Sequence, residues 1–250
     1  MSSLAISLIV FAAIFTGAFG GVFLRNALPQ RHLAEDAKDV VRLGTGLIGT
    51  MAALVLSLLI SSANSSFDTE SGQVKRLTAD IILLDKLLGQ YGPDTRASRD
   101  LLRRAIGPMV ERIWGENNSH SANQTPFVAG LGEDVFAQIL ALSPKDDAQR
   151  GLKERAVAVS SDLAQTRLLL YEQGNGSIPL PFLAVLVFWL AIIFASFSLF
   201  SRLNPTLIAA LFVFALSASG AIFLILELSQ PFTGLMRISS TPLRNALAPL

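Results

Sequence analysis

Four long runs without a charged residue dominate the hydrophobic pattern of the chain. They are residues 4–24, 43–61, 180–200 and 206–226, and each consists mostly of apolar and small residues. A helix of about 20 apolar residues crosses the roughly 30 Å hydrocarbon core of a bilayer. Each run is long enough, so the pattern predicts four transmembrane helices.

The four spans divide the rest of the chain into polar segments. Residues 25–42 form a short loop, residues 62–179 a long segment and residues 229–250 a tail. The expected organisation is therefore a first transmembrane pair (1–61), an inserted polar domain, a second pair (180–228) and the tail. An even number of crossings places both termini and the polar domain on one side of the membrane. Lysine and arginine are equally frequent near the span ends on both sides, so charge does not decide the orientation.

The polar domain carries apolar residues at helical spacing. One stripe has intervals of three and four residues and consists of Val74, Leu77, Ile81, Leu84 and Leu88. Such spacing predicts an amphipathic helix. Similar stripes predict helices over 102–113 with a kink at Gly107-Pro108, over about 126–142, and from a capping Ser143 to about 170. No segment alternates with period two, so the predicted fold class is all-α.

Composition agrees with a membrane protein and excludes several functions. Only 16% of the residues are charged, and the mean hydropathy is +0.51. The net charge is +1 without a basic cluster, which argues against a nucleic-acid partner. The chain has no cysteine and two histidines, which excludes thiolate chemistry and leaves little for metal or acid–base work. We expect neither an enzyme nor a cofactor.

A stripe of small and polar residues follows one face of the second span. Gly46, Thr50, Ala53 and Ser57 are spaced by four, three and four residues. In a membrane such a face either packs closely against another helix or lines water. Val55 and Leu58 offer a hydrophobic constriction if their side faces an axis. The pattern leaves packing and pore lining open.

Two further features of the spans have a packing and a functional interpretation. Gly17 and Gly21 form a G-x-x-x-G pair, for which a helix-packing notch is the expected role. Glu227 closes the fourth span and is the one acid near membrane depth. Ionisable residues there are candidates for function, so Glu227 is a candidate functional acid; the alternative is a solvated helix end.

Two motifs resemble binding sites without their context. The run from Gly44 to Gly49 matches G-x-G-x-x-G, but it opens a transmembrane span and does not follow a strand. In the first loop, His32 and three acids (Glu35, Asp36 and Asp39) alternate with Arg31, Lys38 and Arg42. That mixture favours ordinary ion pairs over a metal site.

Several stretches together resemble one family. They are Leu28-Pro29 followed by His32-Leu33, the Gly- and Ala-rich second span, residues 83–93 (LLDKLLGQYGP), and residues 227–239 (ELSQPFTGLMRIS) followed by Pro242-Leu243. The chain resembles the bestrophin-like domain family of bacterial membrane proteins, a domain of unknown function.

The resemblance implies a bestrophin-type layout. Bestrophins are pentameric anion channels with four spans per subunit, cytosolic termini and a helical cytosolic region between the second and third spans, and their second helix lines the pore. By analogy we expect a homo-oligomeric channel for small anions in a bacterial inner membrane, with residues 62–179 in the cytoplasm. The alternative is a non-conducting scaffold or sensor whose cytosolic helices bind a partner protein. No aromatic-rich neck motif and no acidic calcium clasp can be matched residue by residue.

Overall fold

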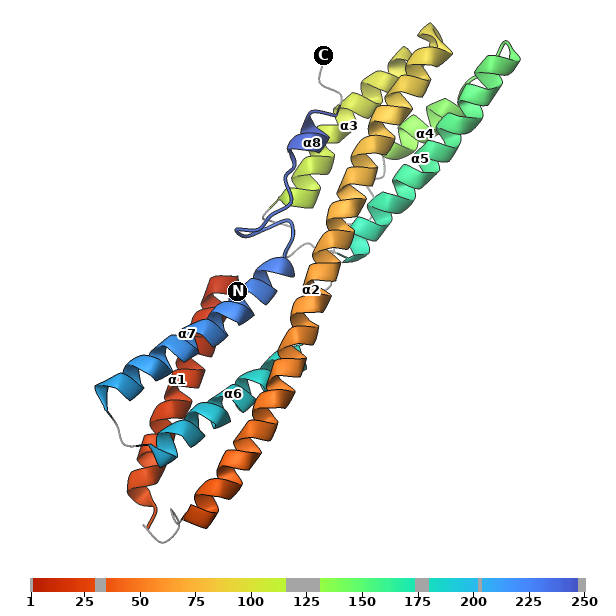
Figure 1. Cartoon of the computed structure of the whole chain (residues 1–250). Coiled ribbons are helices and arrows are strands. Elements are labelled where there is room, and N and C mark those ends of the chain that lie inside the picture. Colours follow the sequence, from red (N-terminus) through yellow and green to blue (C-terminus); the bar gives the residue numbers. More distant parts are fainter. Residues whose placement is uncertain (1, 30–34, 116–130, 174–179, 202–203, 247–250) are drawn as a thin grey trace. The chain divides into compact units, whose positions relative to one another are not determined.

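The computed structural model describes residues 2–29, 35–115, 131–173, 180–201 and 204–246, and every described element is helical (Figure 1). This confirms the predicted all-α class for the described part of the chain. The elements are α1 (Ser3–Ala27), α2 (Glu35–Tyr91), η2 (Pro93–Thr95), α3 (Arg96–Trp114), α4 (Leu131–Ala141), α5 (Asp147–Gln173), α6 (Leu180–Phe200), α7 (Pro205–Leu228) and α8 (Thr241–Arg244).

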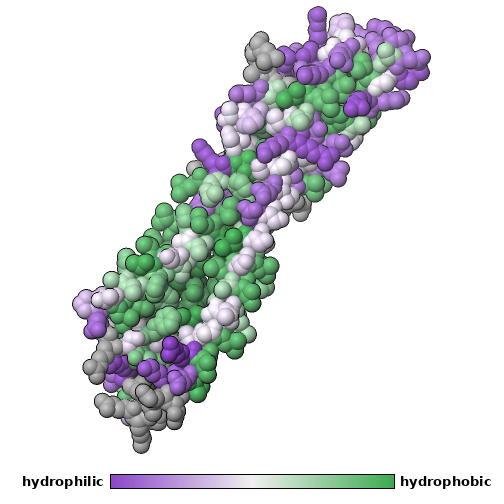
Figure 2. All heavy atoms as spheres, in the orientation of Figure 1, coloured by the Kyte–Doolittle hydropathy of each residue, from purple (hydrophilic) through white to green (hydrophobic). Residues whose placement is uncertain are grey.

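The chain forms two compact units. The first consists of Met1–Ser66 and Ser177–Ser229, and the second of Phe67–Gly176 and Gln230–Leu250. Helices long and apolar enough to cross a membrane lie at Ser3–Ala27, Lys38–Tyr91, Pro181–Phe200 and Pro205–Leu228. In Figure 2 the surface of the first unit is mostly hydrophobic and that of the second mostly hydrophilic.

The second helix is one unbroken element of 57 residues, far longer than a bilayer requires. The polar connection expected over 25–42 is partly helical, because residues 25–27 belong to α1 and α2 begins at Glu35. The boundary expected after residue 61 does not interrupt the helix either. No proline occurs between residues 35 and 91. The helix ends at Tyr91, before Gly92, whose φ of 127° favours glycine, and Pro93.

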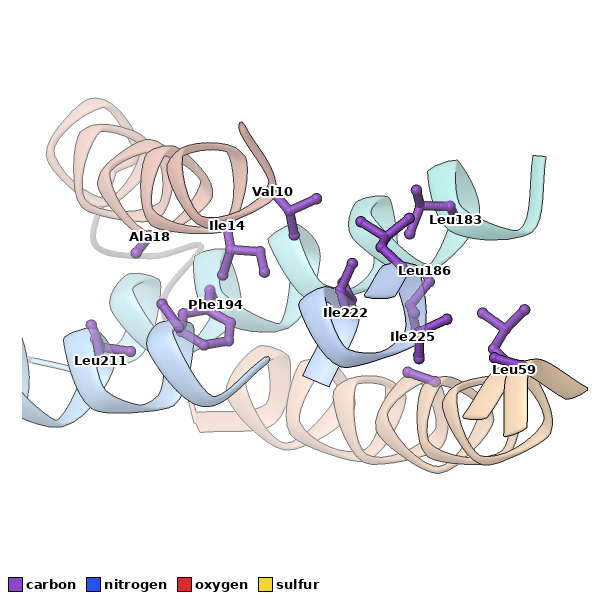
Figure 3. Packing of buried hydrophobic residues seen from close by; sticks show 14 residues of the cluster. Val10, Ile14, Ala18, Leu59, Leu183, Leu186, Phe194, Leu211, Ile222 and Ile225 are labelled. Carbon is purple, nitrogen blue, oxygen red and sulfur yellow. The ribbon is translucent and has the colours of Figure 1, made fainter. Parts of the chain in front are cut away.

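In the first unit, α1 packs against α6 and α7. Side chains from α1, α2, α6 and α7 point toward one another in its core, among them Ile14, Leu59, Leu186, Phe194 and Ile222 (Figure 3). A Cβ atom on Gly17 would lie 2.8 Å from the carbonyl oxygen of Ala191, and one on Gly21 would overlap that of Ala195. The G-x-x-x-G pair is therefore confirmed as a packing notch, facing α6.

In the second unit, the apolar stripe of α2 is buried as predicted. Val74, Leu77 and Ile81 pack in one cluster with Leu163 and Leu170 of α5. Polar contacts flank this core. Arg99 of α3 holds both carboxylate oxygens of Asp85 at 2.8 Å, and Arg76 lies 3.6 Å from Asp162 of α5.

The helices of the second unit differ from the predictions at their ends. The predicted cap Ser143 is wrong by three residues: Asp146 accepts a hydrogen bond from the amide of Gln149 at 2.7 Å, and α5 begins at Asp147. α3 continues through Pro108 to Trp114. Of the helix expected over 126–142, residues 126–130 lie outside the described residues.

The C-terminal tail is part of the second unit. The indole Nε1 of Trp114 donates to the carbonyl of Ile238 at 2.7 Å, and its ring lies edge-on to Phe232 with centroids 5.5 Å apart. Leu243 in α8 is fully buried in the cluster that contains Val74 and Leu77. The tail, which the hydrophobic pattern left without a partner, thus completes a core.

Candidate functional site

The part of α2 in the first unit has a buried face and an exposed face. The buried face consists of Ala52, Leu59 and Ala63, which belong to the core cluster of this unit. At about 100° per residue, the stripe through Gly46 and Ser57 lies roughly 130° away from this buried face. The two faces of the helix therefore have different surroundings.

All four predicted stripe residues are exposed on the subunit. They are Gly46, Thr50, Ala53 and Ser57. A Cβ atom built on Gly46 would meet nothing within 4 Å. Figure 2 shows a pale band of intermediate hydropathy along this part of α2, flanked by hydrophobic surface, as expected for Gly, Thr and Ser. No other described helix of the same chain covers the stripe, so packing within the subunit does not account for it.

The two hydroxyl groups of the stripe differ in their bonding. Thr50 Oγ1 donates to the carbonyl of Leu47 at 2.7 Å, so towards water or an ion it can act only as an acceptor. Ser57 makes no hydrogen bond to a described residue, so its hydroxyl can donate to an anion or to water. Ser57 is therefore the donor that this face offers.

The two residues predicted as a constriction lie on different faces. Leu58 is 65% exposed, next to Leu54 one turn earlier at 72%. Val55 is half-buried and packs against the core cluster. Among these residues, Leu54 and Leu58 form the apolar row that accompanies the exposed stripe.

Glu227 is buried, with 4% of its surface exposed, in the last turn of α7. The interpretation as a solvated helix end therefore does not describe its surroundings. The helix is capped by the amide of Ser229, which donates to the carbonyls of Ile225 and Glu227.

A second buried acid was missed from the sequence. Glu70 is only 6% exposed and lies in α2, in the second unit. It follows Ala63 by seven residues and precedes Val74 by four, so it continues the buried face of the helix. Extending the apolar stripe of Val74 by one turn toward the N-terminus leads to Glu70.

Among the described residues, no group of three or more His, Cys, Asp or Glu side chains could hold a metal ion, and His32 lies outside the described residues.

A family model, the Bestrophin-like domain, matches residues 12–243 of the chain. The chain belongs to the bestrophin-like family. This confirms the resemblance found in the sequence motifs. Comparisons with curated proteins and with solved structures gave no match.

Membership in the bestrophin-like family fits the physical character of the chain. The family is of the channel type and not an enzyme family. Together with four helices of spanning length, it identifies a membrane protein.

Proposed function

We propose that this bestrophin-like protein is the subunit of a homo-oligomeric channel that conducts small anions passively, with the exposed face of α2 around the axis. The proposal rests on one observation, the exposure of the stripe of Gly46, Thr50, Ala53 and Ser57. Of the apolar window of α2, 11% is buried, against 28% for each of the other three apolar helices. The second helix is thus the span with the most surface left for other contacts.

The chemistry of this face favours water or a second copy over lipid. A stripe of glycine, threonine and serine gives lipid chains little to pack against, whereas small residues allow backbones to approach and hydroxyls to bond. Around an axis, the same residues present polar groups to a water-filled path. The face of α2 is therefore suited to the centre of an oligomer, for which the family analogy favours a pentamer.

In the proposed mechanism, donors and apolar rings have separate roles. The hydroxyl of Ser57 donates to a passing anion and replaces part of its hydration shell. Gly46 and Thr50 keep the path wide and wetted. A ring of Leu58, one from each subunit, forms the constriction that opens and closes by wetting and dewetting.

The proposed topology follows the family layout. The four apolar helices span the inner membrane of a bacterium, and both termini and the second unit lie in the cytoplasm. Inserting the second unit between the second and third apolar helices is consistent with this, because an even number of spans separates it from each terminus. Protease protection in sealed spheroplasts tests the placement: trypsin added outside is expected to leave the second unit intact.

The decisive experiment measures current from purified protein in a planar bilayer with a chloride gradient. Wild type is compared with Ser57→Leu on the stripe and with Ser217→Leu, the same change at an exposed position of α7. We expect a current that reverses at the chloride potential, altered by Ser57→Leu and unaltered by Ser217→Leu. Equal currents in all three proteins would contradict the assignment of α2 as the pore-lining helix. The absence of current from a folded oligomer would contradict the channel function.

A non-conducting scaffold is the second candidate, and the internal bond of Thr50 favours it. A hydroxyl that donates to Leu47 within its own helix is compatible with a dry contact between two copies. Cysteine introduced at Thr50 distinguishes the candidates, because the native chain contains no other thiol. Reaction with a charged, water-soluble thiol reagent indicates a wetted conduit, and protection indicates packing and a scaffold.

A further inference from the structure

Two buried acceptor atoms lie one helical turn apart in the second unit. Oε2 of Glu70 and Oε1 of Gln73 are buried, and neither has a hydrogen-bond partner among the described residues. Glu70 is more than nine-tenths buried, and Gln73 is partly buried. Side chains three residues apart on a helix are neighbours, so the side chains of Glu70 and Gln73 lie next to each other on α2.

No described cation compensates the carboxyl group of Glu70. On α2, Arg76 is directed to Asp80 and Asp162, and Lys75 is exposed. On α5, the guanidinium of Arg167 lies against Gly132 of α4. In the tail, Arg237 is exposed. An ionised carboxylate at this position is therefore both desolvated and unpaired, which is the costly case for a buried charge.

A bound proton resolves both deficits at once. Two acceptors without a donor cannot bond to each other, but a protonated carboxyl has one O–H donor. Burial raises the pKa of the Glu70 carboxyl above its ordinary value of 4.5, with no charged group contributing to the shift. The neutral acid is thus the form that this environment favours.

We propose that Glu70 and Gln73 form a buried proton-binding site, in which the protonated carboxyl of Glu70 donates to the amide oxygen of Gln73. The proton comes from the solvent that bathes the second unit. Because α2 is one unbroken helix that also carries the stripe, loss of this proton is a signal on the helix proposed to line the conduit. This coupling to conduction rests on the proposed function, whereas the proton site does not.

The first test measures thermal unfolding of the purified full-length protein between pH 4 and pH 9, followed by tryptophan fluorescence. A raised pKa in the folded state means that the folded protein holds the proton more tightly than the unfolded chain, so stability falls as the pH rises above the ordinary value. In Glu70→Gln this loss is absent. The matched control is Glu154→Gln, which removes an exposed carboxyl from α5.

We expect the melting temperature of Glu70→Gln to exceed that of wild type at pH 8, and the difference to shrink steadily toward pH 4. Glu154→Gln should follow the wild-type profile. Parallel profiles of Glu70→Gln and wild type across the whole range would overturn the proton site, because they would mean that the carboxyl titrates alike in the folded and unfolded chain.

Gln73→Ala tests the direction of the hydrogen bond. If Gln73 accepts from the neutral acid, its removal lowers the folded-state pKa of Glu70, so the loss of stability still begins near the ordinary pKa but levels off at lower pH and is smaller than in wild type. A loss that is larger than in wild type and levels off at higher pH would mean that the amide donates to the carboxylate, which would overturn the proposed arrangement.

Conduction is measured separately on wild type, Glu70→Gln and Glu154→Gln. We expect the wild-type chloride current to change with pH on the side of the second unit and the Glu70→Gln current to stay constant. If the unfolding profiles behave as expected but every protein is silent in the bilayer, the proton site stands and the proposed channel function is overturned. If currents flow but respond to pH equally in both, the coupling is overturned.

Discussion

Replacing Gly21 by alanine tests whether the notch between α1 and α6 determines the packing of the first unit. A Cβ atom at this position would overlap the carbonyl oxygen of Ala195 and lie 2.9 Å from its Cα. Carbon atoms in contact prefer about 3.5 to 4.0 Å, so the two helices must separate by more than half an ångström. The atoms in the way belong to the backbone of α6 and cannot turn aside.

The size of the effect follows from the cost of overpacking. Extra atoms in a well-packed core typically cost about 1 to 3 kcal/mol. Alanine also favours the helix over glycine by roughly 0.8 to 1.0 kcal/mol, which opposes the steric term. Gly20→Ala isolates that second contribution, because a Cβ atom on Gly20 meets nothing within 4 Å. We therefore expect Gly21→Ala to be about 1 to 3 kcal/mol less stable than Gly20→Ala.

The assay is equilibrium unfolding in mixed micelles with increasing SDS, followed by helical circular dichroism and by tryptophan fluorescence. The chain has two tryptophans, and Trp189 of α6 packs against the core of the first unit, so its emission reports this interface. Gly17→Ala should fall between the two variants or match Gly21→Ala. Equal stability of Gly20→Ala and Gly21→Ala would refute the close approach of α1 and α6.

Two further predictions concern the second unit. Leu243→Ala should destabilise it by about 2 to 5 kcal/mol, because the side chain is fully buried, whereas Met236→Ala, at an exposed tail position, should have little effect in the same thermal unfolding assay. The hydrogen bonds from Arg99 hold the pKa of the Asp85 carboxyl below its ordinary 3.8, so this pair contributes stability above that pH and loses it as the pH falls through the lowered pKa. Asp85→Asn should lower the free energy of unfolding by about 1 to 2 kcal/mol at pH 7, which is the value of a charge-assisted hydrogen bond reduced for the partial exposure of Arg99. When unfolding is measured as the pH falls, the variant should lose less stability than wild type.

Local patterns were sufficient for the four long apolar helices and for the amphipathic stripes. Runs of apolar residues predict the four long helices because a bilayer imposes length, and the stripe from Val74 to Leu88 predicts burial because helical periodicity does. The continuity of α2 is not evident from the sequence, because the change from apolar to polar composition near residue 61 resembles the end of a span. A change in composition indicates that the surroundings of a helix change, and it does not by itself end the helix. The helix ends where residues such as Gly92 and Pro93 disfavour its continuation.

Contacts between distant segments were beyond the pattern. Trp114 and Ile238 are joined by a hydrogen bond across more than a hundred residues, and nothing local to either indicates it. The cap of α5 was misplaced for a different reason, because both Ser143 and Asp146 are good caps and only the structure shows which one accepts the amide of Gln149. The exposure of the stripe likewise depends on which face of α2 the other spans cover.

The two faces of α2 differ in character, which gives the proposed conduit and the proposed proton site separate places on one helix. Its buried face continues from Ala63 through Glu70 to Val74, with the partly buried Gln73 beside Glu70. If the proposed proton site holds, removing the proton from Glu70 places an unpaired charge on this face, and a turn or shift of the helix that admits water would relieve it. Because Glu70 and Ser57 lie on one continuous helix, α2 is the element through which the proposed coupling would act. The pH dependence of the chloride current in wild type and Glu70→Gln therefore tests whether the buried acid and the exposed stripe of α2 act together.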